Sequence, residues 1–307
     1  MDYILKTQNL CKLYKNKKAV NGVNINVSKG DIYGFLGQNG AGKTTTIRMI
    51  LGLIKPTEGE VFLFGERIFP GQNAHYGRIG SVIETAGFYP NLTAVENLEI
   101  HRRLMGVTNK SYLEEALEIT GLTDVRNKRV KGFSLGMKQR LGISRALLHK
   151  PEFLILDEPT NGLDPVGIKE IRKLIQDLSM KRKITVLVSS HILSEIQQIA
   201  SKIGIIHEGA LLEEIDFESL KKKSRSYIEI KTSDDKKASF LLEKRKITDY
   251  KVIEQGVIRV YEKLNESSIF NRILSENGVE VSEIRVMNDT LEDYFLQLTG
   301  GSFRIQS

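Results

Sequence analysis

The chain has 307 residues, which is enough for one large domain and a smaller one. Its hydrophobic fraction of 40%, charged fraction of 27% and formal net charge of +7 describe a globular protein with a mildly basic surface, which suits ATP, nucleic acid or an anionic membrane face equally. Cys11 is the only cysteine, which excludes an internal disulfide framework and a cysteine-only metal site and fits a reducing compartment.

The sequence carries no signal for insertion into a membrane. The N-terminal segment up to Lys18 has no continuous apolar region after a basic start, so we predict no signal peptide. No stretch approaches the roughly 20 apolar residues that a membrane-spanning helix needs. Any membrane role is therefore expected to depend on a partner protein.

Residues 1 to about 214 are predicted to alternate between strands and helices. A short apolar strand is expected at residues 31–37, and the helix that follows it at residues 44–53. The runs 153–156 and 184–188 are continuously apolar, as expected of parallel strands that are buried on both faces. We therefore predict an α/β fold around a mainly parallel sheet.

Helices are predicted from their start signals. Between residues 86 and 150 the strand signals stop, and residues 93–96 and 111–114 each fit the capping-box pattern of a hydroxyl followed three residues later by a glutamate. We interpret this stretch as a helical subdomain within the α/β domain. Farther along, Asp164 followed by Pro165 combines an N-cap side chain with a proline at the first helical position.

A second domain is predicted at residues 221–307, after a first domain of residues 1–220. The basic run 221–223 is interpreted as a linker or a solvated face. Helical patterns separate strand-like runs in the order βαββαβ, which suggests a ferredoxin-like accessory domain, and a short helix is expected at residues 290–298. The strand-like runs are residues 227–231, 250–253, 257–261 and 281–286. This region carries no motif to which chemistry can be assigned.

Residues 37–44 read Gly-Gln-Asn-Gly-Ala-Gly-Lys-Thr and match the P-loop pattern G-x-x-x-x-G-K-[ST]. Glycines let backbone N–H groups approach a phosphate chain, and the following helix adds its positive N-terminal end. Lys43 would neutralise the β- and γ-phosphates, and the Thr44 hydroxyl would ligate Mg²⁺. We therefore predict that ATP and Mg²⁺ bind here. The expected nucleotide contacts are Gly37, Asn39, Gly40, Gly42, Lys43, Thr44 and Thr45.

An acidic pair, Asp157 and Glu158, ends the strand predicted at residues 153–156. Ligands of open α/β folds bind at the carboxyl edge of the sheet, so we expect this pair to face the P-loop. Asp157 would hold Mg²⁺ through its hydration shell, and Glu158 would polarise the attacking water. Such a pair alone is more often a loop or capping pair, but the P-loop favours the functional interpretation.

Two further positions narrow the class of protein. Ser134 and Gly136 begin a helix that is expected to run to Leu148, where they either cap the helix or use its N-terminal end to bind an anion. His191 follows the strand predicted at residues 184–188, a position where a histidine is usually a surface or capping residue. The presence of the other motifs, in this order along the chain, favours a functional role for these residues.

Residues from about Leu5 to Glu214 resemble the nucleotide-binding subunit of the ATP-binding-cassette family. The stretch 156–165, Leu-Asp-Glu-Pro-Thr-Asn-Gly-Leu-Asp-Pro, is especially specific to that family. The full resemblance rests on an ordered set of motifs: the P-loop at 37–44, a signature at 134–138, Asp157 with Glu158, the run 161–164, and His191.

The resemblance implies a head-to-tail dimer with two ATP molecules at its interface. Ser134 and Gly136 would contact the γ-phosphate of the ATP held by the opposite cassette, and His191 the γ-phosphate within its own cassette. Asp164 would help to couple the two sites. Tyr14 stands where the family places an aromatic side chain against adenine, although a tyrosine near an N-terminal strand is more often a packing residue.

Two departures from the family pattern are informative. Where the common signature reads LSGGQ, residues 133–138 read Phe-Ser-Leu-Gly-Met-Lys, so the serine and the second glycine are kept. Glu84 stands where the family usually has a glutamine that senses Mg²⁺ and the membrane subunit, and a glutamate there resembles bacitracin-transport and lantibiotic-immunity cassettes. The closing residues 291–295 fit the same subgroup. Glu84 therefore joins Thr44 and Asp157 as a candidate metal contact.

The resemblance implies an ATPase that works with integral membrane permease subunits, cytoplasmic and peripheral on the inner face of the cell membrane. Three functions are compatible with it: export of a peptide antibiotic or lantibiotic, export of a lipid, drug or polysaccharide, and a soluble cassette acting on DNA or ribosomes. The third class usually carries two cassettes in one chain or a long coiled-coil insertion, whereas this chain has one P-loop and no sustained heptads. We therefore expect antibiotic export, with no nucleic acid partner.

Overall fold

The computed structural model describes residues 3–69, 75–84, 87–223, 226–288, Tyr294 and Leu298. Along the chain it divides into two compact units, Met1–Phe217 and Glu218–Ile305. The helix expected at residues 290–298 and the closing residues 291–295 lie outside the described residues, apart from Tyr294 and Leu298.

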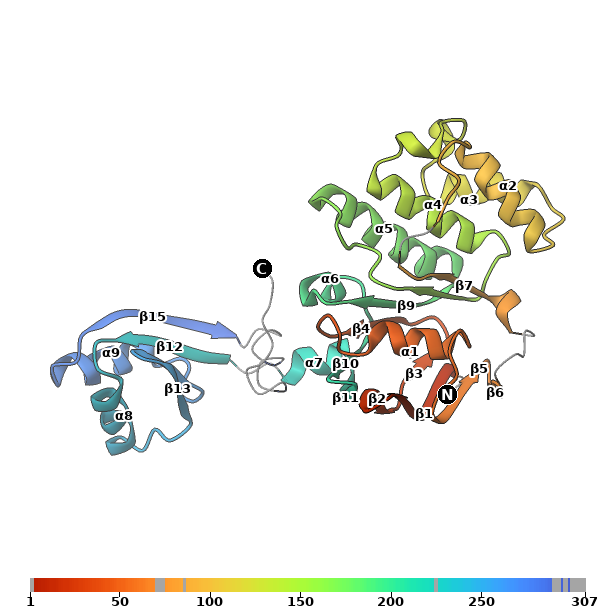
Figure 1. The fold of residues 1–307 in the computed structure, drawn as a ribbon. Helices are drawn as coiled ribbons and strands as arrows, with labels where there is room; N and C mark the ends of the chain where they lie inside the picture. The colour runs from red at the N-terminus through yellow and green to blue at the C-terminus, as the bar shows by residue number, and fades with distance from the viewer. Residues whose placement is uncertain are drawn as a thin grey trace. The chain divides into compact units, whose positions relative to one another are not determined.

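A six-stranded sheet forms the centre of the first unit (Figure 1). Its strands follow the order β11-β10-β4-β9-β8-β7, and each pair from β10 to β7 is parallel, while β11 is antiparallel to β10. The prediction of a mainly parallel sheet is confirmed. The strands are β4 (Ile32–Leu36), β7 (Ile79–Val82), β8 (Phe153–Leu156), β9 (Thr185–Ser190), β10 (Lys202–His207) and β11 (Ala210–Asp216).

The N-terminal strands form a second, antiparallel sheet of order β2-β1-β5-β6, with β3 also paired to β1. The expected alternation of strands with helices is wrong for this region, because only Lys15 and Asn16 separate β1 from β2 and leave no room for a helix. Lys15 adopts a left-handed backbone (φ 49°), which turns the chain back at once. The strands are β1 (Tyr3–Tyr14), β2 (Lys17–Val23), β3 (Asn26–Ser28), β5 (Glu58–Leu63) and β6 (Glu66–Arg67).

Helix α1 (Lys43–Ile50) and the two sheets share one hydrophobic core. It contains Leu5 and Val61 from the antiparallel sheet, Ile47 from α1, and Phe35 and Ile155 from the six-stranded sheet. Burial of each such side chain contributes about 1.5–3 kcal/mol. The helix that begins at the P-loop lysine is thus held from both sides, which fixes the direction of its N-terminus.

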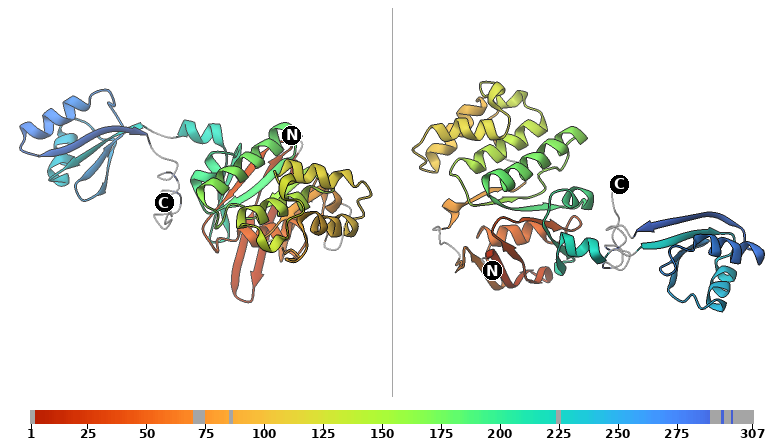
Figure 2. Two further views of the ribbon diagram at one scale, coloured as in Figure 1. Left: turned by 90° about the horizontal axis from the view of Figure 1, so that it is seen from above. Right: turned by 180° about the vertical axis from the view of Figure 1, so that it is seen from behind.

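Other helices cover the opposite face of the six-stranded sheet, as Figures 1 and 2 show. Helix α4 (Leu135–Leu147) packs on β7, and α5 (Pro165–Arg182) and α6 (Leu193–Gln197) pack on β9. Asp164 caps α5 by accepting a hydrogen bond from the Gly167 N–H at 3.0 Å, as its sequence predicted. Within the described part of the chain, no helix combines the length and apolar character needed to cross a membrane.

The described residues between β7 and β8 form helices joined by loops, with no strand among them. Leu98 of α2 (Ala94–Leu104), Leu117 of α3 (Ser111–Ile119) and Leu141 of α4 pack together in a core of their own. Thr93 and Glu96 form the predicted capping box.

The capping prediction at residues 111–114 is wrong. Ser111 is the first residue of α3 and not its N-cap, and the N-cap residue Lys110 makes no side-chain cap. Asn109 is the cause, because its Oδ1 accepts both the Ser111 N–H and the Ser111 hydroxyl, at 2.9 and 2.8 Å. The asparagine turn therefore uses the hydroxyl that would otherwise have capped the helix.

Between Ser226 and Asn288 the second unit is a four-stranded antiparallel sheet with two helices. Its sheet order is β13-β14-β12-β15, so one other strand lies between the two strands that each helix connects, as in a ferredoxin-like fold. The predicted order βαββαβ is confirmed. The elements are β12 (Ser226–Thr232), α8 (Asp235–Lys244), β13 (Tyr250–Glu254), β14 (Val257–Val260), α9 (Ser267–Glu276) and β15 (Val281–Asn288). The run 221–223, expected as a linker or a solvated face, ends helix α7 (Phe217–Lys223).

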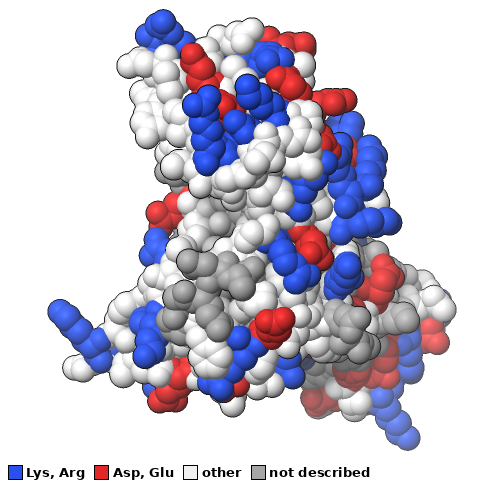
Figure 3. Space-filling view, turned by 90° about the vertical axis from the view of Figure 1, so that its right-hand side faces the viewer, with Lys and Arg blue, Asp and Glu red and all other residues white. Residues whose placement is uncertain are grey.

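Charged side chains of both signs share the surface. Figure 3 shows Lys and Arg side chains gathered over the upper half of one face, with Asp and Glu side chains among them. Among the described residues several cations are paired, such as Arg126 with Glu114 at 2.6 Å, and Lys150 and Arg182 with Glu115 at 3.0 and 2.5 Å. On this face the net positive charge is thus mixed with acids and does not form a continuous basic stripe.

Candidate active site

Three neighbouring parallel strands end at the same edge of the sheet and bring the predicted motifs together. The P-loop follows β4, His191 follows β9, and Asp157 follows β8, in the order β4-β9-β8 across the sheet. The Gly37 N–H donates to the Ser190 carbonyl at 3.2 Å, which joins the start of the P-loop to the end of β9. This is the edge at which open α/β sheets bind ligands.

Two glycines let the P-loop take its path. Gly42 is the N-cap of α1 with a left-handed backbone (φ 108°), and a Cβ there would lie 2.6 Å from the Ala19 carbonyl oxygen. A Cβ at Gly37 would lie 2.4 Å from the Ile206 carbonyl oxygen. Any side chain at either position would push the loop away from neighbouring backbone, so the helix begins at Lys43 with no side chain over its N-terminus.

The Lys43 ammonium lies inside the loop. Its side chain is only 4% exposed, and Nζ donates to the carbonyl oxygens of Gly37 and Gln38 at 2.6 and 3.1 Å. The same Nζ lies 2.9 Å from Oε1 of Glu158. A buried cation that is held by two carbonyls and one carboxylate is a preformed electrostatic site for phosphate oxygens.

Asp157 connects the P-loop helix to the end of β9. Its Oδ2 accepts the Thr44 hydroxyl at 2.8 Å, and its Oδ1 accepts the Ser189 hydroxyl at 2.5 Å. The Ser189 oxygen also accepts the Glu158 N–H at 2.9 Å. Ser189 thus orients both acids of the pair, and sequence analysis missed it because the pairing of β8 with β9 is needed to see the contact.

Glu158 and His191 form a close pair. Nδ1 of His191 lies 2.6 Å from Oε2 of Glu158, and both side chains are mostly buried. Glu158 has a left-handed backbone (φ 48°), a conformation that costs on the order of 1–3 kcal/mol and is typical of residues held for function. A carboxylate fixed by a lysine on one side and a histidine on the other is suited to accept a proton at a defined place.

A pocket of about 820 Å³ opens over the P-loop. Asn39, Gly40, Lys43, Thr44, Thr45 and Glu158 line it, and Tyr14 lies at its edge with 47% of its surface exposed. The pocket also contains residues that sequence analysis missed, namely Lys17 and Lys18 of β2 and the turn of His207, Glu208 and Gly209 between β10 and β11. Only the fold brings that turn to the P-loop, where the Gly209 N–H donates to the Ala41 carbonyl at 2.9 Å.

Ser134, Gly136 and Asp164 do not line this pocket among its described residues. Ser134 is exposed and caps α4 by accepting the Met137 N–H at 3.2 Å. The starts of α4 and α5 are close together, since a Cβ at Gly162 would lie 3.2 Å from a methyl carbon of Leu135. The predicted residues therefore fall into two groups, one around the P-loop and one at these two helix starts, and their roles stay predictions.

Glu84 lies at the same edge of the sheet as Asp157. The Asp157 N–H donates to the carbonyl of Val82, two residues before Glu84, at 2.9 Å. The Glu84 backbone is left-handed (φ 56°), and its Oε1 lies 2.5 Å from Nη2 of Arg48 in α1. The side chain is thus directed to the P-loop helix and not to Asp157.

A magnesium ion fits the oxygen donors at this edge. The described residues contain no group of three or more His, Cys, Asp or Glu side chains able to hold a metal ion by themselves. Mg²⁺ prefers few protein ligands and takes its remaining oxygens from water and substrate phosphates. The Thr44 hydroxyl beside the Asp157 carboxylate matches that need.

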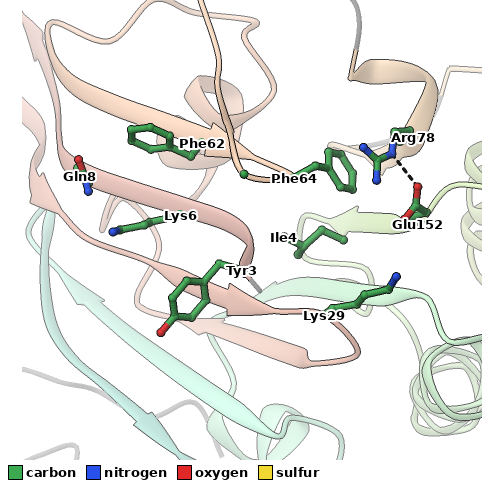
Figure 4. A pocket seen from close by; sticks show the side chains of 10 residues that line it. Tyr3, Ile4, Lys6, Gln8, Lys29, Phe62, Phe64, Arg78 and Glu152 are labelled. Atoms are coloured by element: carbon green, nitrogen blue, oxygen red, sulfur yellow. Dashed lines mark hydrogen bonds and ion pairs between the residues drawn. The ribbon is translucent and has the colours of Figure 1, made fainter. Parts of the chain in front are cut away.

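A second pocket lies on the antiparallel sheet and holds none of the predicted residues (Figure 4). It has a volume of about 440 Å³, and its lining includes Lys6, Phe62 and Phe64. Arg78, which is also part of the lining, stacks over Phe64 at 3.7 Å from the ring centroid and pairs with Glu152 at 2.6 Å. The Arg78 guanidinium is therefore already paired with a carboxylate of the same pocket.

Comparison with known proteins adds to this geometry. The sequence profile of the ABC transporter family matches residues 20–161. The chain is 56% identical to the bacitracin transport ATP-binding protein BcrA of Bacillus licheniformis over 98% of its own length and 99% of that protein. It is 41% identical to the lantibiotic transport ATP-binding protein SrtF of Streptococcus pyogenes over 70% of its own length and 92% of that protein.

A solved structure has the same cassette fold. It is the dimeric, post-hydrolysis state of the ATP-binding cassette MJ0796 bound to ADP and Pi, which is 28% identical to this chain. The superposition has a TM-score of 0.62 and covers 69% of this chain and 98% of that one.

Proposed function

Because the chain belongs to the ABC transporter family and is an ATP-binding, ATP-hydrolysing subunit, we propose that it powers the export of a peptide antibiotic of the bacitracin or lantibiotic type. The observation that carries the proposal is the 56% identity to a bacitracin transport ATP-binding protein, which extends over 98% of this chain and so includes the second unit. We assign nucleotide binding to residues 1–220 and an accessory role to residues 221–307.

The proposed ATP site is the pocket over the P-loop. The N-terminus of α1 and the Lys43 ammonium would attract the β- and γ-phosphates, and Tyr14, which lines the pocket, would contact the adenine. Bound with ATP, Mg²⁺ neutralises phosphate charge, and Thr44 and Asp157 would hold it. Support for this comes from the buried Lys43 and from the hydrogen bond between Thr44 and Asp157.

Glu158 is proposed as the general base. Water attacks the γ-phosphorus, its proton passes to the Glu158 carboxylate, and the bond from that phosphorus to the β-γ bridging oxygen breaks, which leaves ADP and inorganic phosphate. His191 holds the carboxylate from one side at 2.6 Å and is also proposed to contact the γ-phosphate. The Ser189 hydroxyl oxygen accepts the Glu158 N–H and so fixes the backbone of Glu158.

A second cassette is proposed to complete each site. Ser134, Gly136 and Asp164 surround the two helix starts, apart from the P-loop pocket, so within one chain they have no phosphate to bind. A head-to-tail partner would bring its own α4 N-terminus to the γ-phosphate. The dimeric state of the similar cassette bound to ADP and Pi supports this arrangement.

Export also needs a permease. We propose that this chain is cytoplasmic and lies peripherally on the inner face of the cell membrane, bound to separate integral membrane subunits. Support comes from the names of the transport proteins that it resembles. Glu84 is the proposed permease contact, because its side chain is exposed and it lies between β7 and α2 in the sequence.

Bacitracin susceptibility tests the proposed cargo. Cells that lack this ATPase should be inhibited at a lower bacitracin concentration than cells that carry it, and Glu158→Gln should behave like the deletion because it binds ATP without turning it over. Glu118→Gln, a matched change of an exposed glutamate in α3, should restore resistance fully. Equal susceptibility of all strains, with normal ATPase activity in the purified complex, would refute this cargo and leave another exported compound.

A further inference from the structure

We propose that Glu195 is a positioning residue for ATP hydrolysis, which ties the segment of Glu158 and Asp164 to the segment of His191. This inference rests on the proposed function, because it uses the roles proposed for those three residues. Glu195 belongs to α6, and sequence analysis assigned it no role. It does not line the P-loop pocket among the described residues, so it acts through other groups.

The Glu195 carboxylate is buried and shared by two hydroxyls. The residue is only 6% exposed. Its Oε2 accepts the Thr160 hydroxyl at 2.5 Å and the Ser190 hydroxyl at 3.1 Å, and both donors are themselves buried. The Ser190 oxygen also accepts the Ile192 N–H at 3.0 Å. One carboxylate oxygen therefore joins two separate loops.

Each donor stands next to a proposed functional residue. Thr160 follows Glu158 by two residues and precedes Asp164 by four, in a tight loop where the Asn161 N–H donates to the Glu158 carbonyl at 3.1 Å. Ser190 is the last residue of β9 and directly precedes His191. A movement of the loop at Thr160 therefore reaches His191 through Glu195.

Packing alone does not account for a carboxylate at this place. Removing a charged group from water is unfavourable unless close partners compensate it, and the ion pairs found among the described residues include none with Glu195. A leucine would fill a buried helix position at lower cost. The charge-assisted hydrogen bonds from the Thr160 and Ser190 hydroxyls offset part of this desolvation cost. They also hold the loop of Thr160 and the loop after Ser190 at a fixed separation.

The consequence concerns coupling between the two cassettes. Asp164 is proposed to contact the second cassette. The loop that leads to Asp164 contains Thr160, whose hydroxyl donates to the Glu195 carboxylate. Closure of the dimer would then set the position of His191, and with it the Glu158 carboxylate that His191 contacts. Glu195 makes hydrolysis in each site depend on the contact at the interface.

A double-mutant cycle on the full-length protein tests this proposal. Thr160→Val and Glu195→Leu should each lower kcat roughly tenfold, with little change in ATP affinity, and the double variant should be no slower than either single variant because both break the same link. Glu195→Gln should keep most of the activity, since its amide oxygen accepts the same two hydroxyls. Ser190→Ala should resemble Thr160→Val and replaces Glu195→Leu in the cycle if that variant does not fold.

A buried hydroxyl pair in the helical region provides the control. The hydroxyl oxygens of Thr120 and Ser144 lie 2.6 Å apart, and both residues are buried, as Thr160 and Ser190 are. Thr120→Val should lower the Tm and leave kcat unchanged. The proposal is overturned if kcat is unchanged in Thr160→Val, if the two losses add, or if the control loses as much kcat. Normal turnover in Glu158→Gln would instead refute the proposed base, whatever the Glu195 variants do.

Discussion

The glutamate at position 84 is compensated by Arg48, whose Nη2 lies 2.5 Å from its Oε1. As a proposed contact near the nucleotide, the Glu84 carboxylate would repel the triphosphate without this pairing, because like charges at short range raise the free energy of binding. Arg48 belongs to α1, the helix whose N-terminus bears Lys43 and Thr44. We propose that this ion pair lets the chain keep a glutamate where the resemblance to the family predicts a glutamine.

Arg48→Met should raise the KM for ATP about fivefold, because it leaves the Glu84 charge unbalanced, and the same change in a Glu84→Gln background should have little effect. Steady-state ATPase kinetics at low and high salt measure both effects, and screening should shrink the difference at high salt. The pair is exposed, so the Tm should barely change.

Arg67→Met is the matched control for this pair. Arg67 and Glu60 form an ion pair at 2.8 Å with comparable exposure, on the antiparallel sheet. That variant should leave the KM unchanged. A loss of ATP affinity in Arg48→Met that persists in full with glutamine at position 84 would contradict the compensation.

At the scale of elements, the functional side chains also build the helices that carry them. Ser134 and Asp164 are N-caps whose oxygens accept backbone N–H groups of α4 and α5. Lys43 opens α1 behind a glycine cap that covers no N–H group. The start of α1 therefore keeps its N–H groups free of side-chain caps, as a phosphate-binding helix requires, whereas the starts of α4 and α5 are each capped by a side chain.

The central strand β12 sets the stability of the second unit. Ile230→Ala should destabilise this unit by about 2–5 kcal/mol, because the side chain is fully buried among residues of α8, α9 and β14. Thermal or urea unfolding measures the loss. ATP affinity should stay unchanged, since none of the described residues of this unit lines the P-loop pocket.

Val286→Ala serves as the comparison, because Val286 is 56% exposed on the edge strand β15 of the same sheet. Its stability should change by less than about 0.5 kcal/mol. A parallel fall of ATP affinity and stability in Ile230→Ala would show that the second unit supports the nucleotide site directly.

At the scale of the whole molecule, we propose that one chain holds two incomplete halves of a nucleotide site. In the Glu158→Gln background, MgATP should drive the protein into a dimer, because bound ATP is not turned over. Adding Ser134→Arg should abolish that dimer and leave ATP binding to the P-loop intact, since the bulky cation would block the partner's phosphate at the start of α4. Light scattering measures the mass, and fluorescent ATP the affinity.

Ser111→Arg is the control for the added charge, because Ser111 is also an exposed serine at the start of a helix in the same region. It should dimerise normally. Persistence of the ATP-dependent dimer in the Ser134→Arg protein would refute the proposed head-to-tail arrangement.

The sequence alone determined the parts of this protein that depend on local conformation. The P-loop glycines, the Asp164 cap of α5 and the βαββαβ order of the second unit were all predicted, because backbone angles and hydrophobic periodicity are properties of neighbouring residues. Two predictions were wrong, each because a nearby residue or turn favoured another local structure. A two-residue turn after Tyr14 joins two consecutive strands, and Asn109 accepts the Ser111 hydroxyl that was expected to cap the helix.

Only the tertiary structure decided how the site is held in place. Ser189 meets Asp157 across 32 residues, Glu195 meets Thr160 across 35, and Arg48 meets Glu84 across 36. No local sequence pattern predicts the strand order that creates these contacts, because neighbouring parallel strands are connected through helices and are distant in the sequence. Hydrogen bonds between such distant residues form only after the sheet has assembled, so the fold decides which side chains orient the proposed catalytic acids.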